Sequence, residues 1–185
     1  MDETQRKTLL ALAREAIRTF FSDDPPLLYE RMKREQRRPY TDELGCFVTL
    51  HTKKDGALRG CIGNLWPKGP LYDEIFQLAR QAAFNDPRFH PLKKEEVSSI
   101  DLEISLLSSM QAVDDYHSIK LGVDGVLFAH GYHRSVFLPQ VATEQGWDLD
   151  TMLSHLAMKA GMPPTAYRDG MCHFEIFQAE VFKEA

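Results

Sequence analysis

The segment that best combines a reactive side chain with an unusual backbone is Leu58-Arg59-Gly60-Cys61-Ile62-Gly63. Cys61 lies between two glycines, Gly60 and Gly63. Glycine inside a strand usually marks a bulge or a close approach by a ligand or another backbone. Because side chains alternate along a strand, Arg59 and Cys61 are expected to share one face. A guanidinium beside a thiol favours the thiolate, which would make Cys61 a nucleophile at neutral pH.

The same segment also fits a structural cysteine. A two-residue loop at Asp55-Gly56 would place Thr52 opposite Arg59 in a hairpin. The same register would place Leu50 opposite Cys61 and surround the thiol with aliphatic side chains. A cysteine in such surroundings is usually a small core residue. The sequence leaves both interpretations of Cys61 open.

A rigid polar loop at residues 86–91 supplies two further candidates, Arg88 and His90. Arg88 could hold a carboxylate or phosphate through its two-pronged guanidinium, and His90 could move protons near neutral pH. In the alternative interpretation, two prolines fix a turn in which Arg88 forms a structural salt bridge to an acidic residue. Both interpretations stay open.

Three other polar residues could join the site. Glu103 alternates with apolar residues on a predicted strand and is therefore expected to face water. If that face of the sheet is covered, Glu103 becomes a buried acid and a candidate general base. Gln140 and Glu144 are four residues apart and lie on one face of a short helix. They either line a pocket that the Arg59 strand also borders or occupy a surface helix end.

Metal binding and nucleic-acid binding are weakly indicated. His51, His130 and His133 lack the spacing of a specified metal site, so no metal is predicted. Residues 31–38 carry five cationic side chains. We interpret this run as a solvated connector rather than a patch for phosphate or an acidic partner, because it is short and lacks interleaved aromatic residues.

The predicted elements that must position these residues begin with a helix whose apolar stripe runs from Leu9 through Ile17 to Phe20 and Phe21. Asp2 and Gln5 could form its capping box. Strands at 45–52, 58–62, 100–106, 126–128, 135–138 and 174–182 follow, with helices from 69 to 84, after Pro139, and at 149–160. Strands in runs with a few helices between them predict an α+β fold, with an antiparallel or mixed sheet and packed helices. We expect a single domain over 1–185, with room for a small second lobe.

Composition limits the classes of protein. The chain has 185 residues, 43% hydrophobic and 26% charged, which is ordinary for a globular protein. A net charge of -5 argues against a generic nucleic-acid binder, and no apolar run is long enough to span a bilayer. Cys46, Cys61 and Cys172 form no CxxC pair and make a disulfide framework unexpected. The amphipathic N-terminal segment does not resemble a secretory signal, so we expect a cytoplasmic protein with reduced thiols.

Several blocks, taken in order, resemble the AMMECR family. They are Phe47-Val48-Thr49-Leu50 followed by Leu58-Arg59-Gly60-Cys61-Ile62-Gly63, then Ala82-Ala83-Phe84-Asn85-Asp86-Pro87-Arg88-Phe89, Leu102-Glu103-Ile104-Ser105, Leu138-Pro139-Gln140-Val141-Ala142 with Glu144, and Lys159-Ala160-Gly161. The resemblance covers nearly the whole chain, from the first hairpin to the final strand. It implies an α+β fold with helices packed on an antiparallel sheet, and it brings no established catalytic residues.

The resemblance also suggests partners. Prokaryotic members, called protein A of the AmmeMemoRadiSam system, tend to accompany a Memo-like protein that resembles metal-dependent dioxygenases and a radical S-adenosylmethionine (radical-SAM) enzyme. This chain has no iron–sulfur cysteine spacing and no cofactor is predicted for it. Ala157 stands where many relatives have a cysteine before Lys159-Ala160-Gly161. That difference weakens any dithiol or two-cysteine metal site shared with Cys61.

These observations lead to three hypotheses. The leading one is a component of a modification pathway, working with Memo-like and radical-SAM partners on a substrate or small anionic ligand. In it Cys61 is the nucleophile or acyl carrier, Arg59 and Arg88 hold an anion, and Glu103 is the base. Additional binding residues are Gly60, Gly63, His90, Gln140 and Glu144. The competing hypothesis is a non-catalytic interaction module with a structural Cys61, and the third is nucleic-acid binding through residues 31–38.

Overall fold

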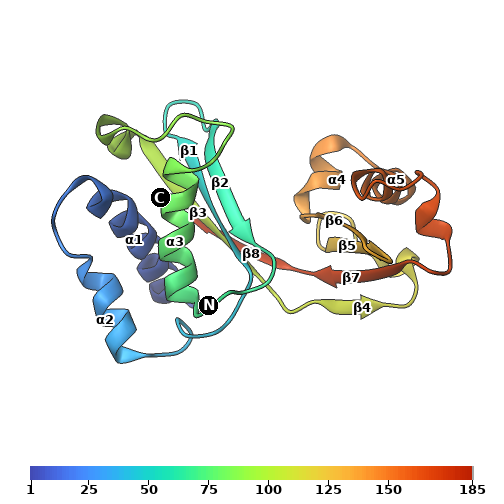
Figure 1. Ribbon diagram of the computed structural model, residues 1–185, viewed down its shortest axis with the longest axis horizontal. Helices are drawn as coiled ribbons and strands as arrows, with labels where there is room; N and C mark the ends of the chain where they lie inside the picture. Colours follow the sequence, from blue (N-terminus) through green and yellow to red (C-terminus); the bar gives the residue numbers. More distant parts are fainter. Residues whose placement is uncertain (185) are drawn as a thin grey trace. The chain divides into compact units, whose positions relative to one another are not determined.

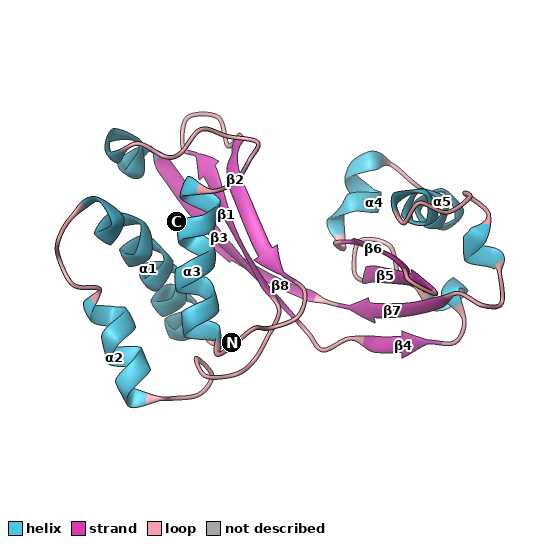
Figure 2. Ribbon diagram, in the orientation of Figure 1, coloured by secondary structure: helices cyan, strands magenta, loops and turns pink. Residues whose placement is uncertain are grey.

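The computed structural model describes residues 1–184 and divides the chain into two compact units. The first unit contains residues 1–107 together with residues 180–184, and the second contains residues 108–179. Each has a hydrophobic core of its own and a four-stranded sheet with helices (Figures 1 and 2). The predicted α+β class is confirmed. Over residues 1–184, no helix combines the length and apolar character needed to cross a bilayer.

The first unit contains a sheet of strand order β2-β1-β3-β8 with helices on one face (Figure 1). Val48 and Leu50 of β1 are fully buried in the same core as Leu9 of α1 and Ile75 of α3, which identifies the covered face. The elements are α1 (Glu3–Arg18), η1 (Thr19–Phe21), α2 (Leu27–Glu35), β1 (Cys46–Thr52), β2 (Leu58–Asn64), α3 (Leu71–Phe84), η2 (Lys94–Ser99), β3 (Ile100–Leu107) and β8 (Ala179–Lys183).

The second unit contains a sheet of strand order β4-β7-β5-β6. Its core includes Val126 and Phe128 of β5 together with Leu153 and Leu156 of α5. The elements are β4 (Gln111–Val113), η3 (Tyr116–Ser118), β5 (Gly125–His130), β6 (His133–Phe137), α4 (Gln140–Gln145), α5 (Leu149–Lys159), η4 (Ala166–Arg168) and β7 (His173–Phe177).

The start of α1 follows its sequence signals. The Asp2 side chain accepts a hydrogen bond from the Gln5 N–H at 2.8 Å, and the Gln5 side chain accepts one from the Asp2 N–H at 2.9 Å. The predicted capping box is therefore confirmed. The buried stripe ends at Ile17, however, and the predicted extension to Phe20 is wrong. Phe20 follows the α-helix in a 3-10 turn, is 54% exposed, and stacks on Phe84.

The basic run is mostly helical, because α2 covers Leu27–Glu35. The prediction of a connector is therefore wrong for this part. The Glu15 carboxylate of α1 accepts the N–H groups of Leu28 and Tyr29 and thereby caps the N-terminus of α2. Two of the cations are paired, Arg37 with Glu35 and Arg38 with Asp42. These pairs reduce the charge available to nucleic acid.

The predicted last strand over residues 174–182 is two strands in two different sheets. β7 ends at Phe177 in the second unit's sheet, and β8 begins at Ala179 and joins the first unit's sheet. Only Gln178 separates them. A continuous apolar alternation carries no sign of this change of sheet, because both strands are half-buried and share the period of two.

The hairpin between β1 and β2 has a different register from the predicted one. Thr49 lies opposite Cys61 and Leu50 lies opposite Gly60, so the predicted pairing of Leu50 with Cys61 is wrong. The loop closes between Thr52 and Ala57, whose backbones hydrogen-bond at 2.9 Å, and is therefore longer than two residues. An irregularity between Leu50 and His51 then shifts the strands by one more position.

Candidate functional site at the edge strand

Packing accounts for the glycines beside Cys61. A Cβ on Gly60 would lie 2.2 Å from the Ala82 carbonyl oxygen of α3, so β2 and this helix touch through their backbones. The predicted close approach of another backbone is confirmed at Gly60. A Cβ on Gly63 would lie 2.2 Å from the ring of Phe47. Here the glycine makes room for a neighbouring side chain of β1.

The Cys61 thiol belongs to a row of polar side chains on the face of the sheet opposite the helices, which we call the outer face. Val48 and Leu50 point into the helical core, so Thr49 between them points to the outer face. Thr49 lies opposite both Cys61 of β2 and Glu103 of β3. Its hydroxyl donates a hydrogen bond to the Cys61 Sγ at 3.2 Å. We call Cys61, Thr49 and Glu103 the outer row.

The three cysteines are all free, but their surroundings differ. Cys46 is fully buried in the first core, and burial raises its pKa to about 12. Cys172 lies in the second unit, where burial also raises its pKa and its thiol donates to the Tyr167 carbonyl. Cys61 is half-buried and accepts a hydroxyl hydrogen bond. Cys61 is therefore better placed than Cys46 to react with a molecule from solution.

Glu103 is partly exposed, with 27% of its side chain accessible, and its carboxylate lies 3.9 Å from the Nε2 of His51. It cannot touch Cys61 directly, because β1 separates the two strands and adjacent strands lie about 4.8 Å apart. The group between them is Thr49. A proton exchanged between Cys61 and Glu103 would have to pass through the Thr49 hydroxyl or a bound molecule.

The backbone of Cys61 is held by two side chains at the free edge of β2. The Asp86 carboxylate accepts the Cys61 N–H at 2.9 Å, and the Arg88 guanidinium donates to the Cys61 carbonyl at 3.0 Å. Arg88 also pairs with Asp86 at 2.7 Å, and the Asp86 side chain is 1% exposed. This ion pair replaces the neighbouring strand that an edge strand lacks. The interpretation of Arg88 as a structural salt-bridge residue therefore describes its present contacts.

The Asp86 carboxylate is ionised over the whole ordinary pH range. The hydrogen bond from the Arg88 side chain holds the Asp86 pKa well below its usual range, and the Cys61 and Arg88 backbone N–H groups act in the same direction. The sequence indicates Asp86 only as part of a rigid loop, because its partner Cys61 lies 25 residues earlier in the chain.

Arg59, Arg88 and His90 line one cavity of about 620 Å³, which we call the edge cavity. Its other lining residues are Pro87, Phe89, Pro91, Lys93 and Glu96. The Arg59 guanidinium pairs with Glu96 rather than with Cys61, at 3.0 Å from Nε and 3.2 Å from Nη2. Its Nη1 is buried and has no hydrogen-bond partner among residues 1–184. The structure thus brings the predicted anion-holding residues together and adds Lys93 and Glu96.

Two predicted binding residues belong elsewhere. Gln140 and Glu144 lie on α4 of the second unit, and both are exposed. Arg59, Cys61, Arg88, His90 and Glu103 all lie in the first unit. The candidate site is therefore confined to the first unit, and a role for Gln140 and Glu144 stays a prediction.

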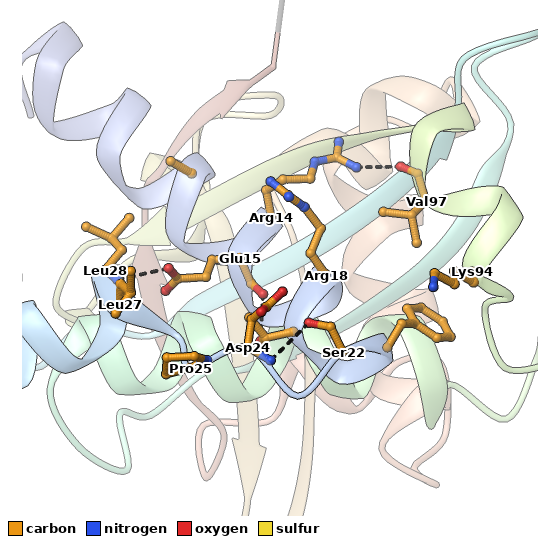
Figure 3. Close-up of a pocket in the computed structure, with 13 residues that line it drawn as sticks. Arg14, Glu15, Arg18, Ser22, Asp24, Pro25, Leu27, Leu28, Lys94 and Val97 are labelled. Atoms are coloured by element: carbon orange, nitrogen blue, oxygen red, sulfur yellow. Dashed lines mark hydrogen bonds between the residues drawn. The ribbon is translucent and has the colours of Figure 1, made fainter.

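Another cavity of about 630 Å³ lies between α1, the start of α2 and η2 (Figure 3). Two of its charged side chains, those of Arg14 and Glu15, already have partners. Arg14 donates to the Val97 carbonyl, and Glu15 accepts the Leu28 N–H, as the dashed lines in Figure 3 show. None of the predicted site residues lines it. The edge cavity is therefore the stronger candidate for ligand binding.

Comparison with known proteins agrees with the sequence blocks. The sequence model of the AMMECR1 family matches residues 10–182. A protein from Methanothermobacter thermautotrophicus is 39% identical, covering all of this chain and 96% of the relative. Protein MJ0810 from Methanocaldococcus jannaschii is 40% identical, over 78% of this chain and 75% of the relative. None of these names states an activity.

A solved structure extends the comparison to the fold. The crystal structure of uncharacterized protein PH0010 from Pyrococcus horikoshii superimposes with a TM-score of 0.75 at 32% identity. The match covers 95% of this chain and 89% of that chain. Sequence and fold lead to the same conclusion, and the chain belongs to the AMMECR1 family.

Proposed function

We propose that this protein is a component of a modification pathway in which Cys61 is the reacting group. The hydrogen bond from the Thr49 hydroxyl to the half-buried Cys61 Sγ supports this proposal. A hydroxyl donor directed at sulfur stabilises the thiolate more than the thiol, because the anion is the stronger acceptor. The thiolate is the nucleophilic form of cysteine.

Each residue of the site has a proposed role. The Cys61 Sγ attacks an electrophilic carbon of an acyl group, forms the S–C bond, and the leaving group departs with its bonding electrons. The thiol proton passes through a bound molecule to Glu103, the proposed base at the other end of the outer row, because the Thr49 hydroxyl is directed at the sulfur as a donor. Arg59 and Arg88 hold an anionic group of the substrate in the edge cavity. Arg88 connects the two places, since it lines this cavity and donates to the Cys61 carbonyl.

Family membership supports two proposed partners, a Memo-like protein and a radical-SAM enzyme. The chain would supply the thiol site, and these partners would supply the redox chemistry. We place the protein in the cytoplasm, where thiols stay reduced. Affinity purification from native cells, followed by mass spectrometry of the bound proteins, tests the partners separately from the chemistry.

The test of the chemistry is the alkylation rate of each cysteine as a function of pH, measured by peptide mass spectrometry. We expect Cys61 to react fastest, and to do so below about pH 8.5, the ordinary range for a free thiol. Cys46 is the internal control, because it is fully buried. Protection of Cys61 until the protein unfolds would make it a packing residue. The interaction-module hypothesis would then take its place, and partner binding should survive Cys61→Ser.

A further inference from the structure

We infer that the edge cavity binds a small carboxylic acid, and that an acid with two carboxylates binds most tightly. This ligand displaces Glu96, the internal carboxylate that pairs with Arg59 in the present structure. The inference rests on the proposed function, because it names the ligand class of the same site. Two residues of this cavity, Lys93 and Glu96, were not predicted from the sequence.

The Arg59–Glu96 pair shows which chemistry the cavity already accommodates. Nε and Nη2 of Arg59 donate to the two oxygens of Glu96 at 3.0 and 3.2 Å. Two parallel bonds of this kind are the geometry in which arginine recognises a planar carboxylate. The hydrogen bond from Arg59 also lowers the Glu96 pKa, so the internal ligand is an anion. A free carboxylate can occupy the same position.

Exchange is feasible because Glu96 has a second partner. Its Oε2 accepts the backbone N–H of Lys93 at 2.8 Å, and 37% of its side chain is exposed. After leaving Arg59, Glu96 keeps this hydrogen bond and gains water. Arg59 is less well satisfied in the present pairing, since its Nη1 is buried without a partner in the described chain. A ligand that also offers an acceptor to Nη1 therefore improves on Glu96.

The charges favour two carboxylates over one. Three permanent cations line the cavity, and the buried Asp86 balances one of them, Arg88. Lys93 is exposed and forms no ion pair within residues 1–184. Once Glu96 leaves Arg59, the side chains of Arg59 and Lys93 both carry a positive charge at the cavity, and Glu96 keeps only its hydrogen bond to the Lys93 backbone N–H. A volume of about 620 Å³ is within the usual range for a small-molecule site.

The experiment is calorimetric titration of succinate into the Cys61→Ser protein, with acetate, succinamide and inorganic phosphate as comparison probes. We expect succinate to bind more tightly than acetate, and neutral succinamide not to bind.

Glu96→Gln should tighten succinate binding about fivefold, because a partly exposed internal competitor is weakened. Glu95→Gln removes the same charge from a neighbour outside the cavity and should change nothing. Lys93→Gln should weaken binding, whereas Lys94→Gln should not.

Several results would overturn the inference. They are an absence of succinate binding to both the parent and the Glu96→Gln variant, equal effects of Glu96→Gln and Glu95→Gln, and binding of phosphate but not succinate. Circular dichroism of each variant establishes that it is folded. Because the titration uses a protein without the Cys61 thiol, a binding result stands even if Cys61 proves unreactive. A reactive Cys61 without succinate binding would leave the proposed function and remove only the ligand class.

Discussion

At the residue scale, the chemistry proposed for Cys61 depends on Thr49. Thr49→Val keeps the size and β-branching of the side chain and removes the hydroxyl that donates to Sγ. We expect alkylation of Cys61 to slow roughly fivefold, because a neutral hydrogen bond is worth about 1 kcal/mol. The measurement is the same peptide mass spectrometry at neutral pH. Thr52→Val is the control on the same strand, since its hydroxyl bonds to Asp55; an equal effect of both variants would contradict the role of Thr49.

Asp86 makes the acid stability of the first unit predictable. In the folded chain the Asp86 pKa is held well below the ordinary value of an aspartate, chiefly by the hydrogen bond from the Arg88 side chain, so folding favours the carboxylate. The stabilisation is fully present above the unfolded pKa and is lost as the pH falls through the folded value. At pH 7, Asp86→Asn should lower the free energy of unfolding by about 1.5–3 kcal/mol, since the bonds lost involve charged groups. The deficit should shrink as the pH falls below 4.

The measurement is urea unfolding at pH 7 and at pH 3.5, followed by fluorescence. Trp66 lies in the first unit and Trp147 in the second, so a Trp147→Phe background reports the first unit alone. Asp23→Asn removes the same charge from an exposed position and serves as the control. A deficit for Asp86→Asn that is independent of pH would show that the ionised form carries no special stabilisation.

The sequence could identify Cys61 and its glycines because the unusual pattern is local. It could not assign partners, since these come from distant segments. Glu96 pairs with Arg59 across 37 residues, and Asp86 binds the Cys61 backbone across 25. A charged residue in a loop has many possible pairing partners along a chain. Only the packing of α3 against β2 determines which of these partners lies close enough to bind. That Arg59 pairs with a carboxylate was predictable from the chemistry of arginine, but the identity of this carboxylate, Glu96, was not.

At the scale of elements, the contact between β2 and α3 fixes the position of the site. Gly60→Ala would place a Cβ 2.2 Å from the Ala82 carbonyl, and backbone cannot move aside as a flexible side chain does. We expect the first unit to lose roughly 3 kcal/mol or more, the upper range for overpacking. Gly69→Ala is the matched control, because a Cβ there meets nothing within 4 Å. Thermal unfolding followed at Trp66 measures both, and similar midpoints for the two variants would refute the tight contact.

Most elements of the first unit were predictable from periodicity. The helical stripes of α1 and α3 and the alternation in β3 are strong signals, and their buried residues match the core. The register of β1 and β2 was not predictable, because a longer loop and one irregular pair shift every cross-strand neighbour. That shift replaces Leu50 by Thr49 opposite Cys61. It therefore changes the expected neighbour of the thiol from aliphatic to hydroxyl.

At the scale of the whole molecule, the chain forms two units around separate cores. The first core draws on α1, α3 and the first sheet, with Phe182 from the end of the chain. Among the described residues, those that form the second core lie between Val113 and Ile176. The sequence predicted a single domain with room for a small lobe, and a change of sheet at Gln178 is invisible in its alternation. Whether the two units unfold together or separately can therefore be tested by destabilising one core at a time.

Ile75→Ala creates a cavity in the first core, where Ile75 is fully buried on α3. Such a truncation removes about 2–5 kcal/mol, so the Trp66 melting midpoint should fall by on the order of 10 °C. If the units unfold separately, the Trp147 midpoint should move much less, because Trp147 packs in the second core. Leu153→Ala in α5 is the reciprocal variant and should show the opposite pattern.

Each tryptophan is followed with the other replaced by phenylalanine. Equal shifts of both midpoints in both variants would show one cooperative domain, and changes made near Cys61 would then be felt throughout the molecule.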